Sequence, residues 1–560
     1  MSSAVRPRRA LTILAAAVIV LLIWTVVYPN VRVITGSFAD GLGHWRAFWA
    51  SASDREALRE SLVISFLSVA AATAIGFPLA LLVARADFPG RGALRVAATL
   101  PAALPPLVGV VAFLFLYGES GVVSRTVQAL FHMKEAPWRF TGRWAIVVVH
   151  AYAFAPFVFA FVAAALERMD GSLDEAARGL GASRMLRFRR VTIPLLAPSL
   201  IGAMLLVFMN SLGSFSAPYV FGGGLRVLST QVVASKLNGA MGLAYVETTV
   251  LALSAVAALF LFRALERGHD VTGGAKGVAV RRVAGTPTTR ALAAIGATLI
   301  VLVLVLPHLM ILLVAFAKNG SWTTQVLPPR YTLENFRRLA QDAELWVPIR
   351  NSVAMAMIAT VANAIVCFIA AYVVVRTRVA GRRLLRVLLI LPWAIPGTAV
   401  ALGLAATFDR NQLGSARILL IGTFWILPLA YFIRGIPLVA SAIEGSLRQM
   451  DPALEDAARG LGARWWLTFR RVILPAARPG LVAGALLAAV SAIGEFVASV
   501  VLYTHANRPI SMEILAQMRA LAFGTAAAYS VLLIALVVAI TAVARWLEGR
   551  SATIERTALG

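Results

Sequence analysis

Apolar residues fill this chain in long runs that short polar stretches divide. A run of about 20 apolar residues is long enough to cross the hydrocarbon core of a bilayer as a helix. Twelve runs meet this description, so the pattern predicts an all-α membrane protein with about 12 transmembrane helices. The expected spans of the first half are 10–29, 59–83, 96–117, 143–166, 195–216 and 244–263. Those of the second half are 291–316, 350–375, 387–408, 417–440, 479–503 and 524–546.

The first apolar run follows Arg6, Arg8 and Arg9, as the apolar core of a signal peptide would. The run is longer than such a core, and no small-x-small cleavage pattern comes before the polar segment that follows. We therefore expect an uncleaved first span.

A polar segment between the fourth and fifth expected spans returns between the tenth and eleventh. It reads MDGSLDEAARGLGA over 169–182 and MDPALEDAARGLGA over 450–463. Each copy continues through a basic stretch into a proline, Pro194 or Pro475. Because each half crosses six times, both halves begin on the same side, and we expect two parallel six-helix repeats.

The repeat also divides the chain. The first half is expected over 1–263, with its polar segment at 167–194, and the second over 291–546, with its segment at 444–475. Between them, 264–290 is polar, basic and rich in glycine, which is typical of a linker, and 547–560 is expected to be a tail.

The net charge of +26 raises the question of a nucleic-acid partner. More than half of the 52 Lys and Arg, however, lie in short segments on one side of the expected spans. This asymmetry follows the positive-inside rule, so it indicates membrane topology with both termini in the cytoplasm and no nucleic-acid partner. The segments are 1–10, 84–95, 167–190, 263–290, 376–386, 444–478 and 545–556.

The repeated polar segment has the features of a short helix that ends in a turn. Acidic residues near its start suit the helix dipole, paired alanines favour helix, and the Gly-Leu-Gly that follows favours a tight turn. A single copy is equally well explained as a solvated loop whose arginines bind lipid. Two copies in register favour two equivalent docking points for a partner outside the bilayer.

The motif Glu-Ala-Ala-x-x-x-Gly, followed by an apolar-x-apolar-Pro pattern, resembles the EAA loop of the inner-membrane permeases of ATP-binding-cassette importers. The resemblance covers essentially the whole chain. It implies type I importer permease architecture for each half and a place in the bacterial inner membrane. The residues that carry it are Glu175, Ala176, Ala177 and Gly181 in the first copy, and Asp456, Ala457, Ala458 and Gly462 in the second.

In that family the loop forms a coupling helix that seats in a groove of a cytosolic ATPase subunit. The resemblance implies this role for Glu175. The second copy departs from the pattern, because Asp456 is one methylene shorter and follows Glu455. Which of these two acidic residues engages the ATPase is left open.

The resemblance implies a cytosolic ATPase dimer and a periplasmic substrate-binding protein as partners, with membrane lipid around the chain. The sequence has no Gly-x-x-x-x-Gly-Lys-Ser/Thr loop, so we expect a permease that is not itself an enzyme. ATP and Mg would be bound by the partner subunit, and this chain would bind no cofactor. A single cysteine, Cys367, and six scattered histidines give no metal-ligand spacing.

Double-length permeases of this plan resemble the ferric-iron uptake group, and segments around Glu495 and Arg508 look like iron-type permeases. Iron is thus the expected cargo, with thiamine, phosphonate, polyamine or an oxyanion as alternatives. Glu495 lies in or beside the eleventh expected span, where an ionisable group is a functional candidate, and Ser214 is its counterpart. Alternatively, Glu495 lies at the outer interface or pairs with a nearby arginine such as Arg508.

A secondary transporter is the rival class. A transporter of that kind would need charged relays within its spans and would have no use for a repeated cytoplasmic docking segment. This chain has the opposite pattern.

Overall fold

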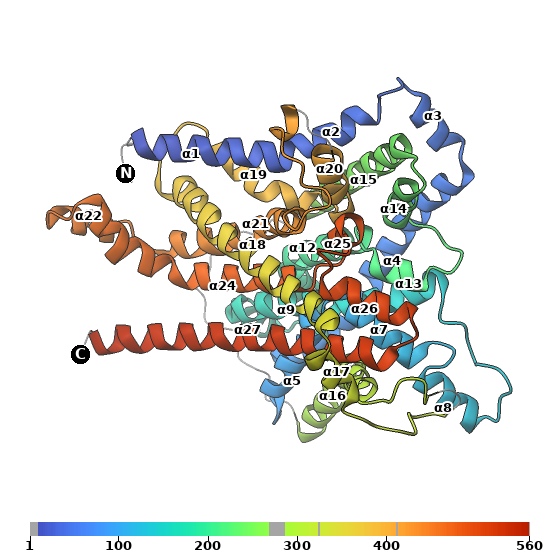
Figure 1. Cartoon of the computed structure of the whole chain (residues 1–560). Coiled ribbons are helices and arrows are strands. Elements are labelled where there is room, and N and C mark those ends of the chain that lie inside the picture. The colour runs from blue at the N-terminus through green and yellow to red at the C-terminus, as the bar shows by residue number, and fades with distance from the viewer. Residues whose placement is uncertain (1–8, 268–285, 323–324, 410–412, 559–560) are drawn as a thin grey trace. The chain divides into compact units, whose positions relative to one another are not determined.

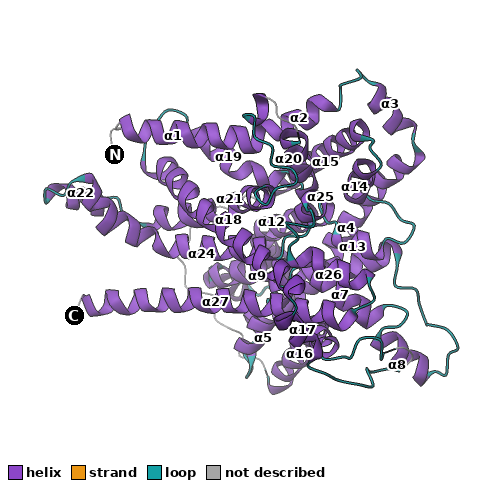
Figure 2. Ribbon diagram, in the orientation of Figure 1, coloured by secondary structure: helices purple, strands orange, loops and turns teal. Residues whose placement is uncertain are grey.

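The computed structural model describes residues 9–267, 286–322, 325–409 and 413–558. The regular elements in these ranges are helices, and the only β-type pairing there is an isolated bridge between Ala317 and Tyr331 (Figure 2). The predicted all-α class is confirmed. Much of the expected linker 264–290 lies outside the described residues.

The longer helices account for the apolar runs (Figure 1). They are α1 (Arg9–Leu22), α2 (Tyr28–Gly36), α4 (Ala52–Arg85), α7 (Pro106–Tyr117), α9 (Gly142–Arg168), α12 (Ile193–Leu212), α15 (Met241–Arg267), α16 (Pro287–Ala315), α18 (Ala343–Arg376), α19 (Arg382–Ala394), α20 (Gly397–Phe408), α21 (Ile426–Gln449), α24 (Leu474–Ile493) and α27 (Phe523–Ala558).

Shorter helices connect them. They are α3 (Gly43–Ala50), α5 (Arg91–Ala97), α6 (Leu100–Ala103), α8 (Val122–Leu130), α10 (Gly171–Gly179), α11 (Arg184–Arg187), α13 (Ser216–Phe221), α14 (Leu228–Leu237), α17 (Glu334–Gln341), α22 (Ala453–Gly460), α23 (Trp465–Thr468), α25 (Val497–Leu502) and α26 (Ile510–Arg519). Short π-helical turns join α1 to α2, α11 to α12 and α23 to α24.

Among the described residues, 11 helices are long and apolar enough to cross a membrane, and a bent pair raises the number to 12. The pair is α19 and α20, which meet at 109°. Ile395, between them, is extended, as expected of a residue before a proline, and Pro396 lacks the amide that would continue the helix. The expected ninth span, 387–408, is thus a broken one.

The expected third span, 96–117, is wrong at its start. Leu104 is extended before Pro105, as Ile395 is before Pro396, and the apolar helix begins at Pro106. The same local cause, a residue forced out of helix by the following proline, therefore breaks both repeats at equivalent places.

The described chain forms two compact units that differ from the two halves of the sequence. Unit 1 comprises Met1–Trp45, Met241–Thr249 and Glu334–Gly560, and unit 2 comprises Arg46–Ala240 and Val250–Leu333. The halves 1–263 and 291–546 thus describe the repeat in the sequence. The compact units differ from these halves, because the first helices of each half belong to the unit that contains most of the other half.

Specific contacts fix each first helix in its unit. In unit 1, the indole nitrogen of Trp24 donates to the carbonyl of Gly414 at 3.1 Å, and the rings of Trp24 and Phe408 lie 5.5 Å apart. In unit 2, Nε of Arg290 donates to the carbonyl of Asp87 at 2.7 Å. Each compact unit therefore contains the first helix of the half that forms most of the other unit.

Small residues let the spans pack closely within each unit. A Cβ on Gly76 of α4 would lie 2.5 Å from the carbonyl oxygen of Ala155 on α9. A Cβ on Gly480 of α24 would lie 2.3 Å from that of Ala442 on α21. Such glycines are typical of helix interfaces in membranes, where close backbone approach supplies the packing energy.

The two repeats match down to single hydrogen bonds. The amide of Leu228, the first residue of α14, donates to Oγ of Ser61 at 2.8 Å. The amide of Ile510, the first residue of α26, donates to Oγ of Ser352 at 2.8 Å. Each serine satisfies one of the unpaired amides at a helix start, so Ser61 of α4 and Ser352 of α18 make equivalent contacts in the two repeats.

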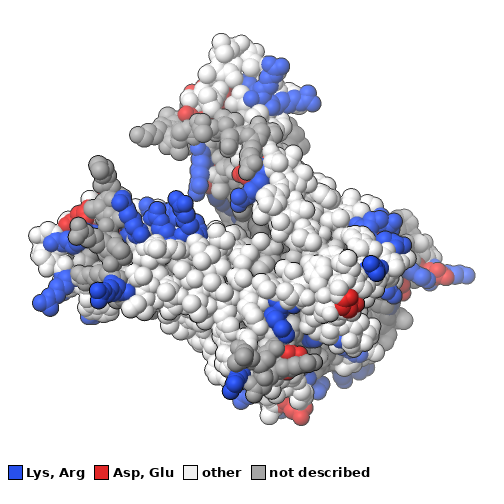
Figure 3. All heavy atoms as spheres, turned by 90° about the horizontal axis from the view of Figure 1, so that it is seen from above, with Lys and Arg blue, Asp and Glu red and all other residues white. Residues whose placement is uncertain are grey.

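Charge is distributed unevenly over the surface. Figure 3 shows Lys and Arg in several groups on the visible face, with mostly uncharged residues between them. A largely uncharged surface is what a bilayer requires of the residues that face it.

Candidate functional site

The first copy of the repeated segment forms the predicted helix and turn. Asp170 precedes α10, and its carboxylate accepts from the amide of Ser172 at 3.0 Å. After the helix, the amides of Gly181 and Ala182 donate back to the last turn at 2.9 and 3.0 Å. Gly181 has φ +81°, a conformation that residues with a Cβ rarely adopt. The glycine of the motif is therefore required by the turn.

The second copy has the same construction. The amide of Ala453 donates to the carboxylate of Asp451 at 2.9 Å, and α22 follows. The amides of Gly462 and Ala463 each donate back at 3.0 Å, and Gly462 has φ +78°. In unit 1, α22 lies at the end where α1 begins and α27 ends (Figure 1).

Each turn exposes a leucine between its two glycines. Leu180 is 89% exposed and Leu461 is 90% exposed. On the helices themselves, Leu173 and Leu454 are also exposed. An exposed apolar surface at the same place in both repeats is typical of a docking surface. Leu180 and Leu461 were not predicted from the sequence, although a leucine between two glycines in a polar segment was a signal for them.

Each copy has one acidic residue that is exposed and one that faces the protein. Glu175 is exposed, while Asp174 lies 3.2 Å from Nε of Arg187. Asp456 is likewise on the exposed side, where its side chain contacts Arg459 at 3.3 Å. By position, Asp456 corresponds to Glu175.

Glu455, the counterpart of Asp174, is buried. Its side chain is 5% exposed and lies 3.5 Å from Nε of Arg376 and 3.7 Å from Arg459. Burial raises the pKa of the Glu455 carboxyl, against the opposing effect of the two arginines. Of the two acidic residues left open by the sequence, it is Asp456 that lies on an exposed surface.

An arginine at the end of the second span holds the segment in both repeats. Arg376, the last residue of α18, donates to the carbonyl of Met450 at 2.7 Å. Arg85, the last residue of α4, donates to Oγ1 of Thr192 at 3.1 Å. The repeated segments are thus tied to long helices that run through their units.

Glu495 pairs with an arginine that was not predicted from the sequence. Its Oε2 accepts from Nε of Arg434 on α21 at 2.8 Å, and its Oε1 accepts from the amide of Ala498 at 2.9 Å. The suggested partner, Arg508, instead contacts Glu513 at 2.8 Å, so that pairing was wrong. The charge of Glu495 is already compensated inside unit 1.

Ser214 takes part in a neutral cluster in unit 2. Nε2 of His150 lies 2.9 Å from Oγ of Ser214, and Nδ1 of His150 lies 3.0 Å from the hydroxyls of Ser68 and Ser211. The two candidate pathway positions therefore have different chemistry, an ion pair in one repeat and a histidine–serine cluster in the other.

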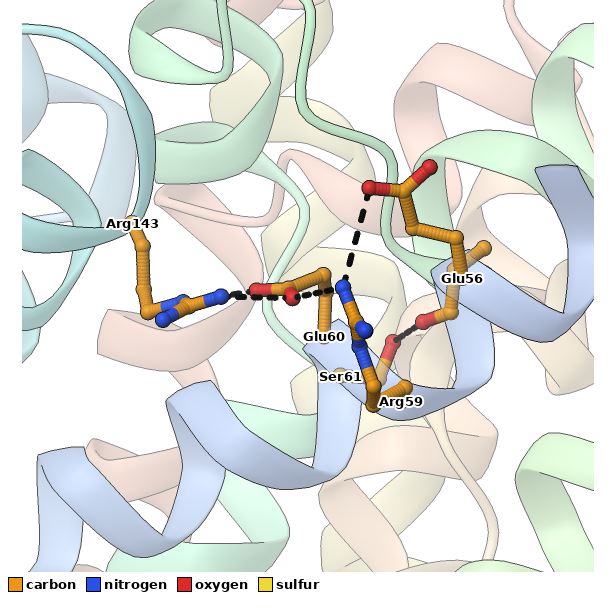
Figure 4. A network of polar contacts seen from close by, with 6 residues as sticks. Glu56, Arg59, Glu60, Ser61 and Arg143 are labelled. Atoms are coloured by element: carbon orange, nitrogen blue, oxygen red, sulfur yellow. Dashed lines mark hydrogen bonds and ion pairs between the residues drawn. The ribbon is translucent and has the colours of Figure 1, made fainter.

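A further buried carboxylate, Glu60 of α4, was not singled out from the sequence. It is 1% exposed, and both of its oxygens accept from Arg143 at 2.7 Å, while Arg59 donates to one of them at 3.1 Å (Figure 4). In the second repeat, Asn351 stands in its place and donates to the carbonyls of Ala506 and Arg508. A glutamate at the start of an apolar run was the available signal.

No group of three or more His, Cys, Asp or Glu that could hold a metal ion occurs within the described ranges. The compensated carboxylates Glu60 and Glu495 are each engaged by arginine.

Comparison with known proteins adds the following. Residues 76–270 and 364–552 match the family model described as "Binding-protein-dependent transport system inner membrane component". The chain is 31% identical over 429 residues to the "Probable ABC transporter permease protein y4fN" of Sinorhizobium fredii, which covers 76% of this chain and 75% of that protein. It is 26% identical over 547 residues to the "Ferric transport system permease protein FbpB" of Actinobacillus pleuropneumoniae, which covers 95% of this chain and 77% of that one.

Among solved structures, part of the chain aligns with the "Crystal structure of a bacterial ABC transporter involved in the import of the acidic polysaccharide alginate". The TM-score is 0.38 at 20% identity, and the match covers 46% of this chain and 95% of that one.

Proposed function

Because the chain belongs to the family of inner-membrane components of binding-protein-dependent transport systems, we propose that it docks a cytosolic ATPase dimer through α10 and α22. The observation that carries the proposal is the repeated construction of these helices. Each presents an exposed acidic residue, Glu175 or Asp456, and an exposed leucine, Leu180 or Leu461.

The two kinds of exposed residue would make different contributions to docking. Burying a leucine that is fully exposed contributes roughly 1.5–3 kcal/mol and gives the contact its affinity. A carboxylate at the rim contributes less to affinity and more to orientation and specificity. Asp456 would take the role of Glu175 with a shorter side chain, and Glu455 would hold α22 against α18.

Movement of the docked ATPase subunits would reach the spans through the same contacts. In the second repeat, Arg376 connects α22 to α18 through Glu455 and Met450. In the first repeat, Arg187 connects α10 to the basic turn before α12 through Asp174. When ATP binding brings the ATPase subunits together, both docking helices would be displaced, and the spans would follow.

One chain would supply both docking helices of a transporter, and both of its termini would lie in the cytoplasm of a bacterial cell. The arrangement of unit 1 supports this orientation, because α22 lies at the same end as the start of α1 and the end of α27 (Figure 1). The basic segments at that end agree with the positive-inside rule. A periplasmic binding protein would then deliver the cargo at the opposite face.

Ferric iron is the proposed cargo. The support comes from the ferric permease relative, which is similar over 95% of this chain. Glu495 adds no support, because its carboxylate is held by Arg434 at 2.8 Å. Thiamine, phosphonate, polyamine and oxyanions are the alternatives.

The test is the initial rate of uptake of radiolabelled ferric iron by iron-limited cells. Cells that lack the gene would be compared with cells complemented by the wild type or by the Leu180→Asp/Leu461→Asp variant at equal membrane abundance. We expect uptake to fall on deletion, to return with the wild type and to stay low with the variant.

Uptake that is unchanged by deletion would contradict the iron assignment, and the alternative solutes would then be tested in the same strains. Full uptake with the variant would contradict the docking assignment.

A further inference from the structure

A cavity of about 270 Å³ lies in unit 1 where the end of α18, the start of α19 and the end of α21 meet. Four of its six lining residues are arginines. The lining residues are Val374, Val375, Arg382, Arg383, Arg386 and Arg448. Like charges around one cavity repel one another, so their arrangement favours an anion between them.

Little of this charge is compensated by the protein. Arg448 donates to Glu444 at 2.9 Å, and Arg382 donates to the carbonyl of Thr377 at 3.2 Å. Within the described part of the chain, Arg383 and Arg386 have no hydrogen bond or ion pair. The four guanidinium groups of the cavity are thus compensated by one carboxylate, that of Glu444.

In the first repeat, a carboxylate of the chain itself compensates the arginine at the equivalent position. There Arg95, the counterpart of Arg386, forms an ion pair with both carboxylate oxygens of Glu167. Glu167 stands two residues before Met169, as Arg448 stands two before Met450, so an arginine replaces the glutamate in the second repeat. The excess of positive charge is therefore a property of this one repeat and not of the fold.

The surface next to the cavity is apolar and exposed. Along α19, the residues at every third position are open to the surroundings, by 46% to 60%. They are Leu384, Val387, Ile390 and Trp393. A basic cavity beside an apolar stripe suits an amphiphile with an anionic head and hydrocarbon chains.

We propose that this cavity binds the phosphate headgroup of an anionic phospholipid, with the acyl chains along the exposed face of α19. Arg383 and Arg386 would donate to the phosphate oxygens, since guanidinium groups match phosphate geometry. In the orientation proposed above, the lipid comes from the inner leaflet. The binding chemistry itself is independent of the ATPase and of the cargo.

The test is native mass spectrometry of the purified full chain with dioleoylphosphatidylglycerol, with dioleoylphosphatidylcholine, or with inorganic phosphate. Two variants remove the site. Arg383→Gln/Arg386→Gln removes the uncompensated groups, and Arg448→Glu introduces the residue type that the first repeat has there. The matched control is Arg189→Gln/Arg190→Gln, which removes two exposed arginines from another basic segment.

We expect the wild type and the control to retain phosphatidylglycerol and both site variants to bind it about tenfold more weakly or worse. Equal loss in the control, or equal retention of phosphatidylcholine, would overturn the proposal. Binding of inorganic phosphate without retention of phosphatidylglycerol would assign the cavity to a free anion and would also overturn the proposed binding of a lipid. Failure of the iron or docking tests would leave this result unaffected.

Discussion

Glu455 and Arg376 lie 3.5 Å apart, with side chains that are 5% and 9% exposed, and join α22 to the end of α18. The residue next to Glu455 in the chain, Asp456, is on the exposed side of the same helix. Under the docking proposal, these two adjacent carboxylates have separate roles, which substitution can distinguish.

Replacing Glu455 by alanine should destabilise the chain, because Arg376 would keep its buried charge without a carboxylate to compensate it. We expect a loss of about 2 kcal/mol in the free energy of unfolding, measured by thermal unfolding of the purified chain in detergent. The control, Asp456→Asn, should change that stability by less than about 0.5 kcal/mol and weaken ATPase docking instead. The reverse pattern would contradict the assignment of the two roles.

Replacing Gly181 or Gly462 by alanine should weaken docking, because each has a positive φ at the turn that presents the exposed leucine. An alanine there costs roughly 1–2 kcal/mol and is expected to displace the turn. The control is Gly179→Ala, a position without positive φ where an added Cβ would meet nothing within 4 Å. Docking is measured as the amount of ATPase that co-purifies with the tagged chain. Equal loss in all three variants would show that the turn geometry is not the cause.

The pair of Glu495 and Arg434 should behave as a structural unit. Arg434→Met should destabilise the chain by about 1–3 kcal/mol, since it leaves the 7% exposed Glu495 without its partner. The double variant Arg434→Met/Glu495→Met should recover part of this loss, as a double-mutant cycle would reveal. If Glu495→Gln abolished uptake of the cargo at unchanged stability, the carboxylate would contact cargo, and a purely structural role would be excluded.

The two arginines that contact Glu60 should contribute unequally to the stability of the chain. Arg143 donates through two nitrogens to both carboxylate oxygens, while Arg59 makes a single contact and is 67% exposed (Figure 4). We expect Arg143→Ala to cost about 2 kcal/mol of unfolding free energy and Arg59→Ala less than about 1 kcal/mol. Thermal unfolding of the two variants side by side would check this, and equal costs would contradict it.

Features that depend on local sequence could be predicted. The apolar runs gave the spans, and the motif around Glu175 gave the short helices α10 and α22 with their turns. The prolines at 105 and 396 were the available signal for the breaks in the third and ninth spans, which we expected to be continuous, because a residue before proline leaves the helical conformation.

Features that depend on distant partners could not be predicted. The exchange of first helices between the compact units requires long-range packing, such as that of Trp24 with Gly414, which periodicity does not record. Arg508 is the nearer arginine to Glu495 in the sequence, yet the partner is Arg434 on another helix. Likewise, the burial of Glu455 beside exposed Asp456 follows from the position of Arg376, at the end of a different helix.

The most direct test of two equivalent docking helices is the number of ATPase subunits bound to one chain. The complex would be purified through a tag on the chain from its own membranes, and its stoichiometry measured by native mass spectrometry. Leu180→Asp, Leu461→Asp and their combination would be compared with Leu333→Asp, which changes a leucine that is 68% exposed elsewhere. We predict two subunits for the wild type and the control, one for each single variant and none for the double variant. Two subunits retained by the double variant would contradict docking through α10 and α22.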